Sequence, residues 1–207
     1  MHARRHGGAI KRRDREKRGG FERGRGRGGS GSFRGDCRYR PASVQRNVGG
    51  GAWTCRPLRH VHRRSQLPGW LAENEAAFDL IFVDTPAHDT DTLADAAKLA
   101  DLAIIVTEPT YLANAVAARI QTAFVQEDIE YAILLTRTPS QLNRRLNHWL
   151  TLHRELGTVV DAHLAYRVAY QDAVALGLGV VEYEPDGPAA QEVRAATDWI
   201  LKKLELV

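Results

Sequence analysis

The chain has 207 residues, of which 43% are hydrophobic, and this length suits a single α/β domain. Its charge is divided unevenly, because residues 1–64 hold 19 of the 29 Lys and Arg but only four of the 25 Asp and Glu. Residues 1–64 therefore carry a net charge of +15, and residues 65–207 a net charge of −11. No run approaches the roughly 20 apolar residues that cross a bilayer, and the two cysteines lack zinc-site spacing, so the composition argues against membrane-spanning and zinc-binding proteins.

Residues 1–64 also differ from the rest of the chain in apolar content. They hold 13 of the 18 Gly and only one Leu and one Ile. Such a segment buries too little apolar surface to offset the entropy lost on folding. The sequence therefore predicts a disordered, basic, Arg/Gly-rich segment over residues 1–64 and a folded portion over residues 65–207.

The folded portion alternates apolar runs with segments of helical pattern. Four runs are typical of buried strands, and their starts are separated by 23, 29 and 27 residues, which is the spacing of strand–helix–strand repeats. The expected strands cover residues 79–84, 102–107, 131–136 and 158–164. The expected helices cover residues 89–100, 111–126 and 142–153, with a last helix from Pro188. This order predicts an α/β fold with a partial doubly wound, mostly parallel sheet and helices on both faces.

Polar residues follow three of the apolar runs directly. They occupy positions 84–86, 107–109 and 136–139. Ligands of such sheets bind at the carboxyl ends of the strands, and an acid at that place usually holds a metal or a water beside a phosphate. One interpretation is a single ligand site at this edge. The other is that these residues cap the helices that follow.

Four segments resemble a known family in their order and spacing. They are "FDLIFVDTPA", "LADLAIIVTEPTYLANAV", "ILLTRTPS" and "YRVAYQDAVALGLGVVEYEPDGPAAQEVRAATDWIL". Together they resemble the later part of the ParA/MinD-type partition ATPases, over residues 65–207. The resemblance implies a deviant P-loop ATPase that uses ATP and Mg²⁺ for plasmid or chromosome segregation. It also implies a homodimer, nonspecific DNA and a ParB-type centromere-binding protein as partners, and a cytoplasmic, nucleoid-associated location.

The resemblance also assigns roles to individual residues. Asp84 matches the Walker B-like acid that holds the magnesium-bound water, and it is the expected catalytic residue. Thr85 and Pro86 open the switch that follows this strand. Thr136 and Arg137 lie where the family contacts the base side of the nucleotide. All five residues are therefore expected at a nucleotide site.

A further segment matches the part of the family that contributes to its DNA-binding face. It contains Arg167 and Tyr170, and Arg167 is the expected DNA contact, although a solvated surface arginine is the alternative. The MinD branch binds membranes through a basic amphipathic C-terminal helix. The ending "DWILKKLELV" is too short for such a helix, so we expect no membrane binding.

The N-terminal part departs from the family pattern. The family begins with a strand and the phosphate loop "KGGxGK[ST]", and a second strand ends in "DxDPQ"; residues 1–64 contain neither motif. One interpretation is an Arg/Gly-rich tail that binds nucleic acid, or a charged tail without a specific partner.

The other interpretation is that these residues are translated out of frame. Residues 35–42, "GDCRYRPA", can be encoded by GGC GAT TGC CGA TAT CGA CCC GCA, followed by AGC for Ser43. Read one base later, this DNA encodes Ala-Ile-Ala-Asp-Ile-Asp-Pro-Gln, which contains the "DxDPQ" motif. On this interpretation the original frame resumes near Ser65.

Two functional hypotheses follow. The first is a ParA-like ATPase by resemblance that neither binds ATP tightly nor hydrolyses it, because the Walker A loop is absent from its sequence. The second is a non-catalytic nucleic-acid-binding protein that acts through its Arg/Gly-rich segment. An acid hydrolase that combines Asp84 with Asp89 or Asp91 is a weaker third hypothesis, because acids at helix starts are usually caps.

Overall fold

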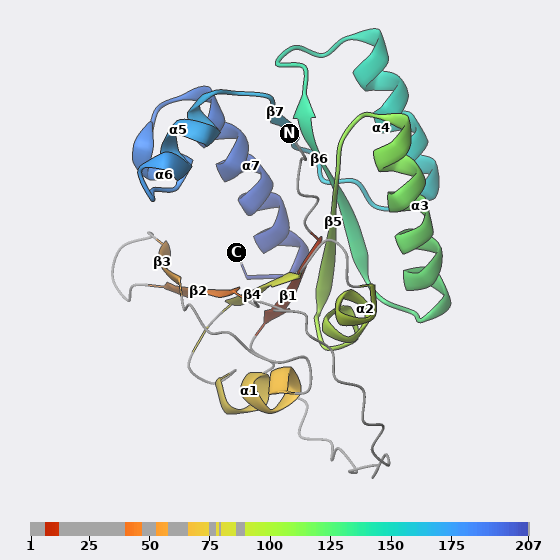
Figure 1. The fold of residues 1–207 in the computed structure, drawn as a ribbon, viewed down its shortest axis with the longest axis vertical. Helices are drawn as coiled ribbons and strands as arrows, with labels where there is room; N and C mark the ends of the chain where they lie inside the picture. The colour runs from red at the N-terminus through yellow and green to blue at the C-terminus, as the bar shows by residue number, and fades with distance from the viewer. Residues whose placement is uncertain are drawn as a thin grey trace.

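A computed structural model describes residues 7–12, 40–46, 53–57, 66–74, 78, 80–85 and 90–206. Its seven strands form one sheet in the order β3-β2-β4-β1-β5-β6-β7 (Figure 1). The strands are β1 Gly7–Arg12, β2 Arg40–Arg46, β3 Trp53–Pro57, β4 Leu80–Thr85, β5 Leu102–Thr107, β6 Tyr131–Thr138 and β7 Leu164–Ala165. The helices are α1 Leu67–Asn74, α2 Thr90–Lys98, α3 Tyr111–Gln126, α4 Arg144–Leu156, α5 Ala169–Ala175, α6 Val180–Tyr183 and α7 Pro188–Lys203.

The directions of the strands confirm an α/β sheet in which most strands run the same way. β6 pairs in parallel with both β5 and β7. β1 is antiparallel to both of its neighbours, β4 and β5, so β4 and β5 also run in the same direction. β2 is antiparallel to β4 and to β3, which makes β3 run with β4. Among the described strands, β1 and β2 run against the other five.

Three described ranges fall within residues 1–64, the segment that the sequence predicts to be disordered. β1, β2 and β3 all lie in this segment, and they are strands of the sheet. β1 lies between β4 and β5 and pairs with both, so its main-chain groups have partners on two sides. Main-chain pairing needs little apolar composition, which is why the composition of the segment did not reveal these strands. The rest of the segment lies outside the described residues.

The weakest of the expected strands is also shorter than the sequence predicted. Instead of a strand over residues 158–164, an isolated bridge joins Val159 to Ile133, and β7 begins only at Leu164. Between them the chain turns out of the sheet at Asp161, which is exposed. A charged side chain in solvent and a continuous buried strand are incompatible at this position.

Helices pack on both faces of the sheet, as predicted (Figure 1). On one face α7 packs its Ala196, Ile200 and Leu201 against the sheet. The sheet residues of this cluster are Leu80, Leu102, Ile104, Ala132 and Leu134. On the other face, α2 and α3 cover Ala103, Ile105 and Ile133. None of the helices in the described part of the chain is long and apolar enough to cross a membrane.

Candidate functional site

β4 brings Asp84 and Thr85 to the carboxyl edge of the sheet. Along β4 the side chains alternate between faces, so Thr85 lies on the side of Ile81 and Val83, which pack near α1 and α2. Asp84 lies on the opposite face and is exposed, whereas Thr85 is only 2% exposed. An acid therefore stands in solvent at the end of a buried strand, where the sequence placed it. Pro86 lies outside the described residues.

The ends of β5 and β6 are joined by side-chain contacts. Thr136 donates a hydrogen bond from Oγ1 to the carbonyl oxygen of Thr107, at 3.2 Å. Arg137 forms an ion pair with Glu108, at 3.3 Å between Nη1 and Oε1. The guanidinium carbon of Arg137 also lies 5.6 Å from the ring centroid of Tyr166, within reach of a cation–π contact. Thr136 and Arg137 thus belong to one polar cluster with Thr107 and Glu108.

The backbone at Arg137 is strained. Its φ is 53°, in the left-handed region that non-glycine residues rarely occupy, and the β6–β7 register shifts between Thr136 and Thr138. A non-glycine residue in this region costs about 1 kcal/mol. Strain of this kind is often found at functional sites, where the surrounding contacts hold it in place.

Two buried oxygens at the β5–α3 junction lack hydrogen-bond partners. Thr107 Oγ1 and Asn114 Oδ1 are both buried and unpaired. The amide nitrogen of Asn114 donates to the carbonyl oxygens of Thr110 and Glu108, at 2.6 and 3.4 Å, which holds the side chain over the junction. Sequence reasoning did not single out Asn114. The sequence feature that could have identified Asn114 is an amide side chain in the first turn of α3, directly after the polar end of β5.

Asp84 lies apart from this cluster. Gly7 of β1 pairs with Thr85 on one side and with Ile105 on the other, so these two residues are level across the sheet. Asp84 is therefore level with Ile104. Thr107 lies three residues further along β5, which is about 10 Å in the strand direction. β1 also separates β4 from β5 by two strand spacings, which add about 10 Å sideways. The two residues are thus about 14 Å apart, so Asp84 and the polar cluster of β5 and β6 lie at separate places along this edge of the sheet.

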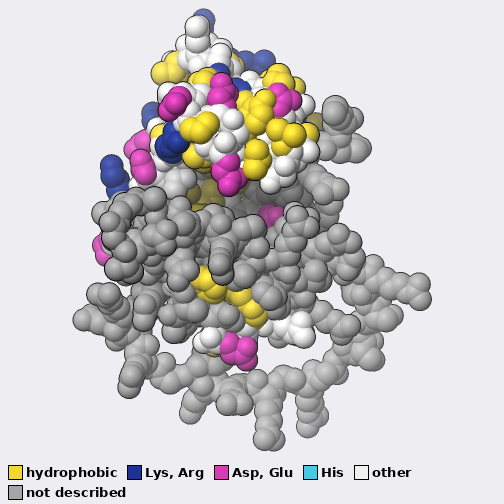
Figure 2. Space-filling model, turned by 90° about the vertical axis from the view of Figure 1, so that its left-hand side faces the viewer, with side chains coloured by type: hydrophobic (Ala, Val, Ile, Leu, Met, Phe, Trp, Pro, Cys, Tyr) yellow, Lys and Arg dark blue, Asp and Glu magenta, His cyan; other side chains and the backbone are white. Residues whose placement is uncertain are grey.

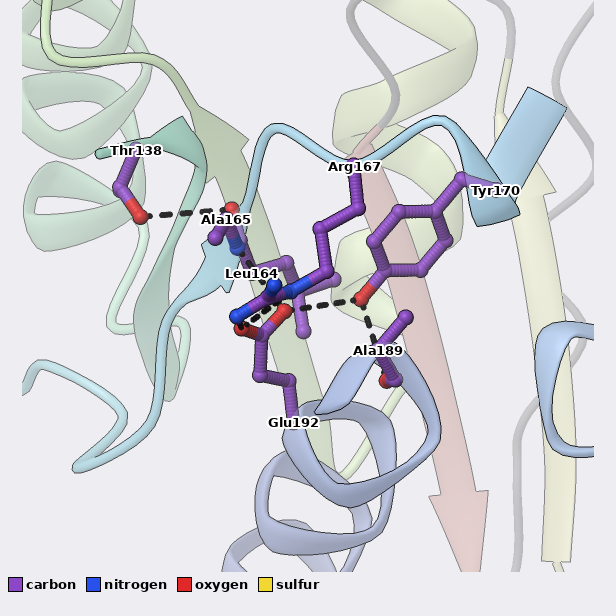
Figure 3. Close-up of polar contacts among 7 residues, drawn as sticks. All are labelled: Thr138, Leu164, Ala165, Arg167, Tyr170, Ala189 and Glu192. Carbon is purple, nitrogen blue, oxygen red and sulfur yellow. Dashed lines mark hydrogen bonds and ion pairs between the residues drawn. The ribbon is translucent and has the colours of Figure 1, made fainter. Parts of the chain in front are cut away.

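Arg167 takes part in an internal network rather than standing free in solvent (Figure 3). Its Nε and Nη2 both donate to Oε1 of Glu192, at 2.9 and 2.7 Å. The other carboxylate oxygen, Oε2, accepts hydrogen bonds from the backbone nitrogen of Ala165 at 3.0 Å and from the hydroxyl of Tyr170 at 3.3 Å. Contact of Arg167 with DNA stays a prediction, and the structure gives this residue a structural role as well.

The electrostatics of this network favour the charged pair. The hydrogen bond to Glu192 is the main cause that raises the pKa of Arg167. Burial, followed by the negative charge of Glu192, raises the pKa of the Tyr170 hydroxyl well above its usual range, so it stays a donor. The network joins the segment between β7 and α5 to the first turns of α7.

The described residues do not fit a nucleoside triphosphate. A phosphate loop must leave the carboxyl end of a strand that runs parallel to β4 and β5. β1 runs the other way: it begins at that edge, with Gly7 opposite Thr85, and ends at Arg12 opposite Leu80. β1 therefore ends at the far edge of the sheet. At the near edge Arg137 already pairs with Glu108, and in the described ranges no three His, Cys, Asp or Glu residues converge as a metal site.

Comparison with known proteins identifies the fold. No family model and no curated protein matches the chain. Among solved structures, the chain is similar to the cell division ATPase MinD of Pyrococcus furiosus, with a TM-score of 0.57 and 14% sequence identity. The likeness covers 77% of this chain and 69% of that one. At this identity the likeness shows the fold alone, and the fold of this chain is similar to that of MinD.

Proposed function

We propose that the chain is a diverged ParA/MinD-type partition ATPase that keeps the fold but neither binds ATP tightly nor hydrolyses it. The MinD-like fold and the four ordered segments in residues 65–207 support the first part. The single observation that carries the second part is the direction of β1, which ends at the edge of the sheet opposite to the one that holds Asp84.

The energetic consequence is large. Hydrogen bonds to charged groups contribute about 1.5–3 kcal/mol each. Micromolar affinity corresponds to only about 8 kcal/mol of binding free energy. The loss of four or five loop contacts to the phosphates therefore removes most of the affinity. In the related ATPases the loop, its lysine and Mg²⁺ also stabilise the transferred phosphoryl group, so hydrolysis is lost with binding.

The out-of-frame interpretation supplies a cause for this divergence, and the coding DNA tests it. All three frames of the DNA that encodes residues 1–80 are read. The interpretation predicts that another frame encodes "KGGxGK[ST]" and then "DxDPQ" ahead of Ser65, and that a frame-restored chain binds ATP. If no frame encodes these motifs, the Arg/Gly-rich segment is genuine and the ATPase relationship is only one of distant ancestry.

The net charge of +15 in residues 1–64 favours a second candidate function, nucleic-acid binding through this segment. Fluorescence anisotropy with a labelled DNA duplex distinguishes the two. A binding segment holds DNA without ATP, loses affinity steeply between about 50 and 200 mM salt, and weakens when Arg23, Arg25 and Arg27 become Gln. A partition ATPase of the intact type binds DNA only with ATP. Our first proposal predicts that ATP leaves the DNA affinity of this chain unchanged.

The remaining family properties are part of the same proposal. They are a ParB-type centromere-binding partner, nonspecific DNA and a place at the nucleoid, whereas the homodimer of the family depends on ATP. Because ATP closes the dimer in this family, we expect the present chain to be monomeric with and without ATP. Sedimentation of the chain with and without Mg²⁺ and ATP tests this expectation.

A further inference from the structure

Exposed apolar side chains gather on the hairpin formed by α5 and α6. Val168, Val174, Leu176, Leu178 and Tyr183 expose 61%, 75%, 66%, 41% and 38% of their surface. Figure 2 shows the hydrophobic side chains grouped on the upper part of this face, with acidic side chains among and beside them. We call Val168, Leu176, Leu178 and Tyr183 the α5–α6 face; Val174, two residues from both Asp172 and Leu176, lies on another side of α5. Contiguous apolar side chains in solvent are a common sign of a binding surface.

Three exposed residues of the α5–α6 region lie on one side of α5. Val168, Asp172 and Leu176 are spaced by four residues, so they lie on the same side of the helix. Asp172 also borders a depression of about 480 Å³ that Ala169, Tyr183 and Glu184 line as well. A carboxylate at the rim of a depression is thus placed between two exposed apolar side chains.

The charge of the surroundings is negative. Asp172, Glu182, Glu184 and Asp186 are all exposed, and in the described part of the chain no Lys or Arg forms an ion pair with them. The two arginines of this region are engaged elsewhere. Arg167 pairs with Glu192, and Arg194 donates a hydrogen bond to the carbonyl oxygen of Pro185. Among the described residues, the α5–α6 face therefore combines apolar contact area with exposed carboxylates that form no ion pair.

We propose that the α5–α6 face binds an amphipathic helix of a partner protein whose Lys or Arg is flanked by apolar residues at i−4 and i+4. The basic side chain would enter the depression between Asp172 and Glu184, and the flanking apolar side chains would cover Val168 and Leu176. A second copy of this chain is the wrong occupant, because a symmetric contact would place these carboxylates against each other. The acidic rim likewise disfavours anionic lipid. The inference is independent of nucleotide binding.

The test uses the full chain and a synthetic amphipathic helix as probe. One face of the probe carries Leu, Lys and Leu at positions i, i+4 and i+8, and a control peptide has Glu in place of Lys. Binding is followed by fluorescence anisotropy and mapped by backbone amide NMR shifts. The variants are Leu176→Ser and Asp172→Lys. Val125→Ser is the matched control, because Val125 of α3 is 65% exposed but lies outside this face.

The inference predicts that the Lys peptide binds at least tenfold more tightly than the Glu peptide, with shifts at Val168, Asp172, Leu176 and Tyr183. Leu176→Ser and Asp172→Lys should each weaken binding at least tenfold, and Val125→Ser should leave it unchanged. Three results would overturn the inference. They are equal affinity for both peptides, shifts that map to another surface, and a chain dimer that Leu176→Ser dissociates.

Discussion

Arg167 and Glu192 hold two parts of the chain together through one carboxylate oxygen. Nε and Nη2 of Arg167 both donate to Oε1 of Glu192, at 2.9 and 2.7 Å. The second oxygen, Oε2, accepts hydrogen bonds from the backbone nitrogen of Ala165 and the hydroxyl of Tyr170. The two side chains are 23% and 17% exposed, so solvent screens the pair only partly. The pair therefore fixes the path of the chain from β7 into α5 against α7.

Replacing Glu192 by Ala should destabilise the chain by about 2 kcal/mol, because hydrogen bonds to charged groups contribute about 1.5–3 kcal/mol and the arginine is left half-buried without its partner. Urea unfolding measures the change. Asp198→Ala is the control, because Asp198 is an exposed acid of the same helix, and its loss should stay within about 0.5 kcal/mol. A loss at Glu192 as small as that of the control would show that the network does not stabilise the fold.

Arg137 gives a prediction that depends on backbone conformation alone. Its φ of 53° suits glycine, so Arg137→Gly should be more stable than Arg137→Ala by about 1 kcal/mol, although both variants lose the ion pair with Glu108. At Arg119, an exposed residue of α3, the order should reverse, with Ala more stable than Gly by about 1 kcal/mol. Urea midpoints of the four variants provide the measurement. The same order at both positions would contradict the strained backbone at Arg137.

His153 gives a pH dependence with a defined sign. It is 2% exposed, neither ring nitrogen has a hydrogen-bond partner, and burial lowers its pKa from the ordinary value of 6.5. The unfolded chain therefore takes up a proton first as the pH falls through about 6.5, and the free energy of unfolding decreases below that pH.

Replacing His153 by Leu removes two unpaired buried nitrogens, so it should stabilise the chain by about 1 kcal/mol at pH 7.5. The gain in stability over the wild-type chain should be larger at pH 5.5. At that pH the unfolded wild-type chain is protonated at His153, whereas the variant has no imidazole at this position. Chemical unfolding at the two pH values measures both effects. His148→Gln is the control, because His148 is exposed on the same helix. A gain that is the same at both pH values would rule out titration of His153 as the cause.

The sequence predicted the C-terminal elements well where two independent signals agreed. Helix α3 begins at Tyr111 and ends at Gln126, as expected, because Pro109 bars an earlier start and the apolar spacing of the helix is regular. α7 begins at Pro188 and buries Ala196 and Ile200 on the predicted side. The acid at the end of β4 followed from an apolar run that stops at Asp84.

The remaining features depend on contacts that no local pattern contains. β1 is a strand because β4 and β5 provide partners on both sides, and its direction is a property of the assembled sheet. The position of β1 between β4 and β5 also places Asp84 apart from Thr136 and Arg137. The left-handed conformation of Arg137 is likewise set by the shifted register between β6 and β7.

The most direct test of the central claim is a titration of the full chain with a fluorescent ATP analogue in the presence of Mg²⁺. Because β1 ends at the edge of the sheet away from Asp84, we predict no saturable binding below about 1 mM, which corresponds to about 4 kcal/mol. Saturable binding at micromolar concentrations that ATP competes away, and that Asp84→Asn weakens, would contradict the account. It would show that the chain holds the phosphates despite the direction of β1.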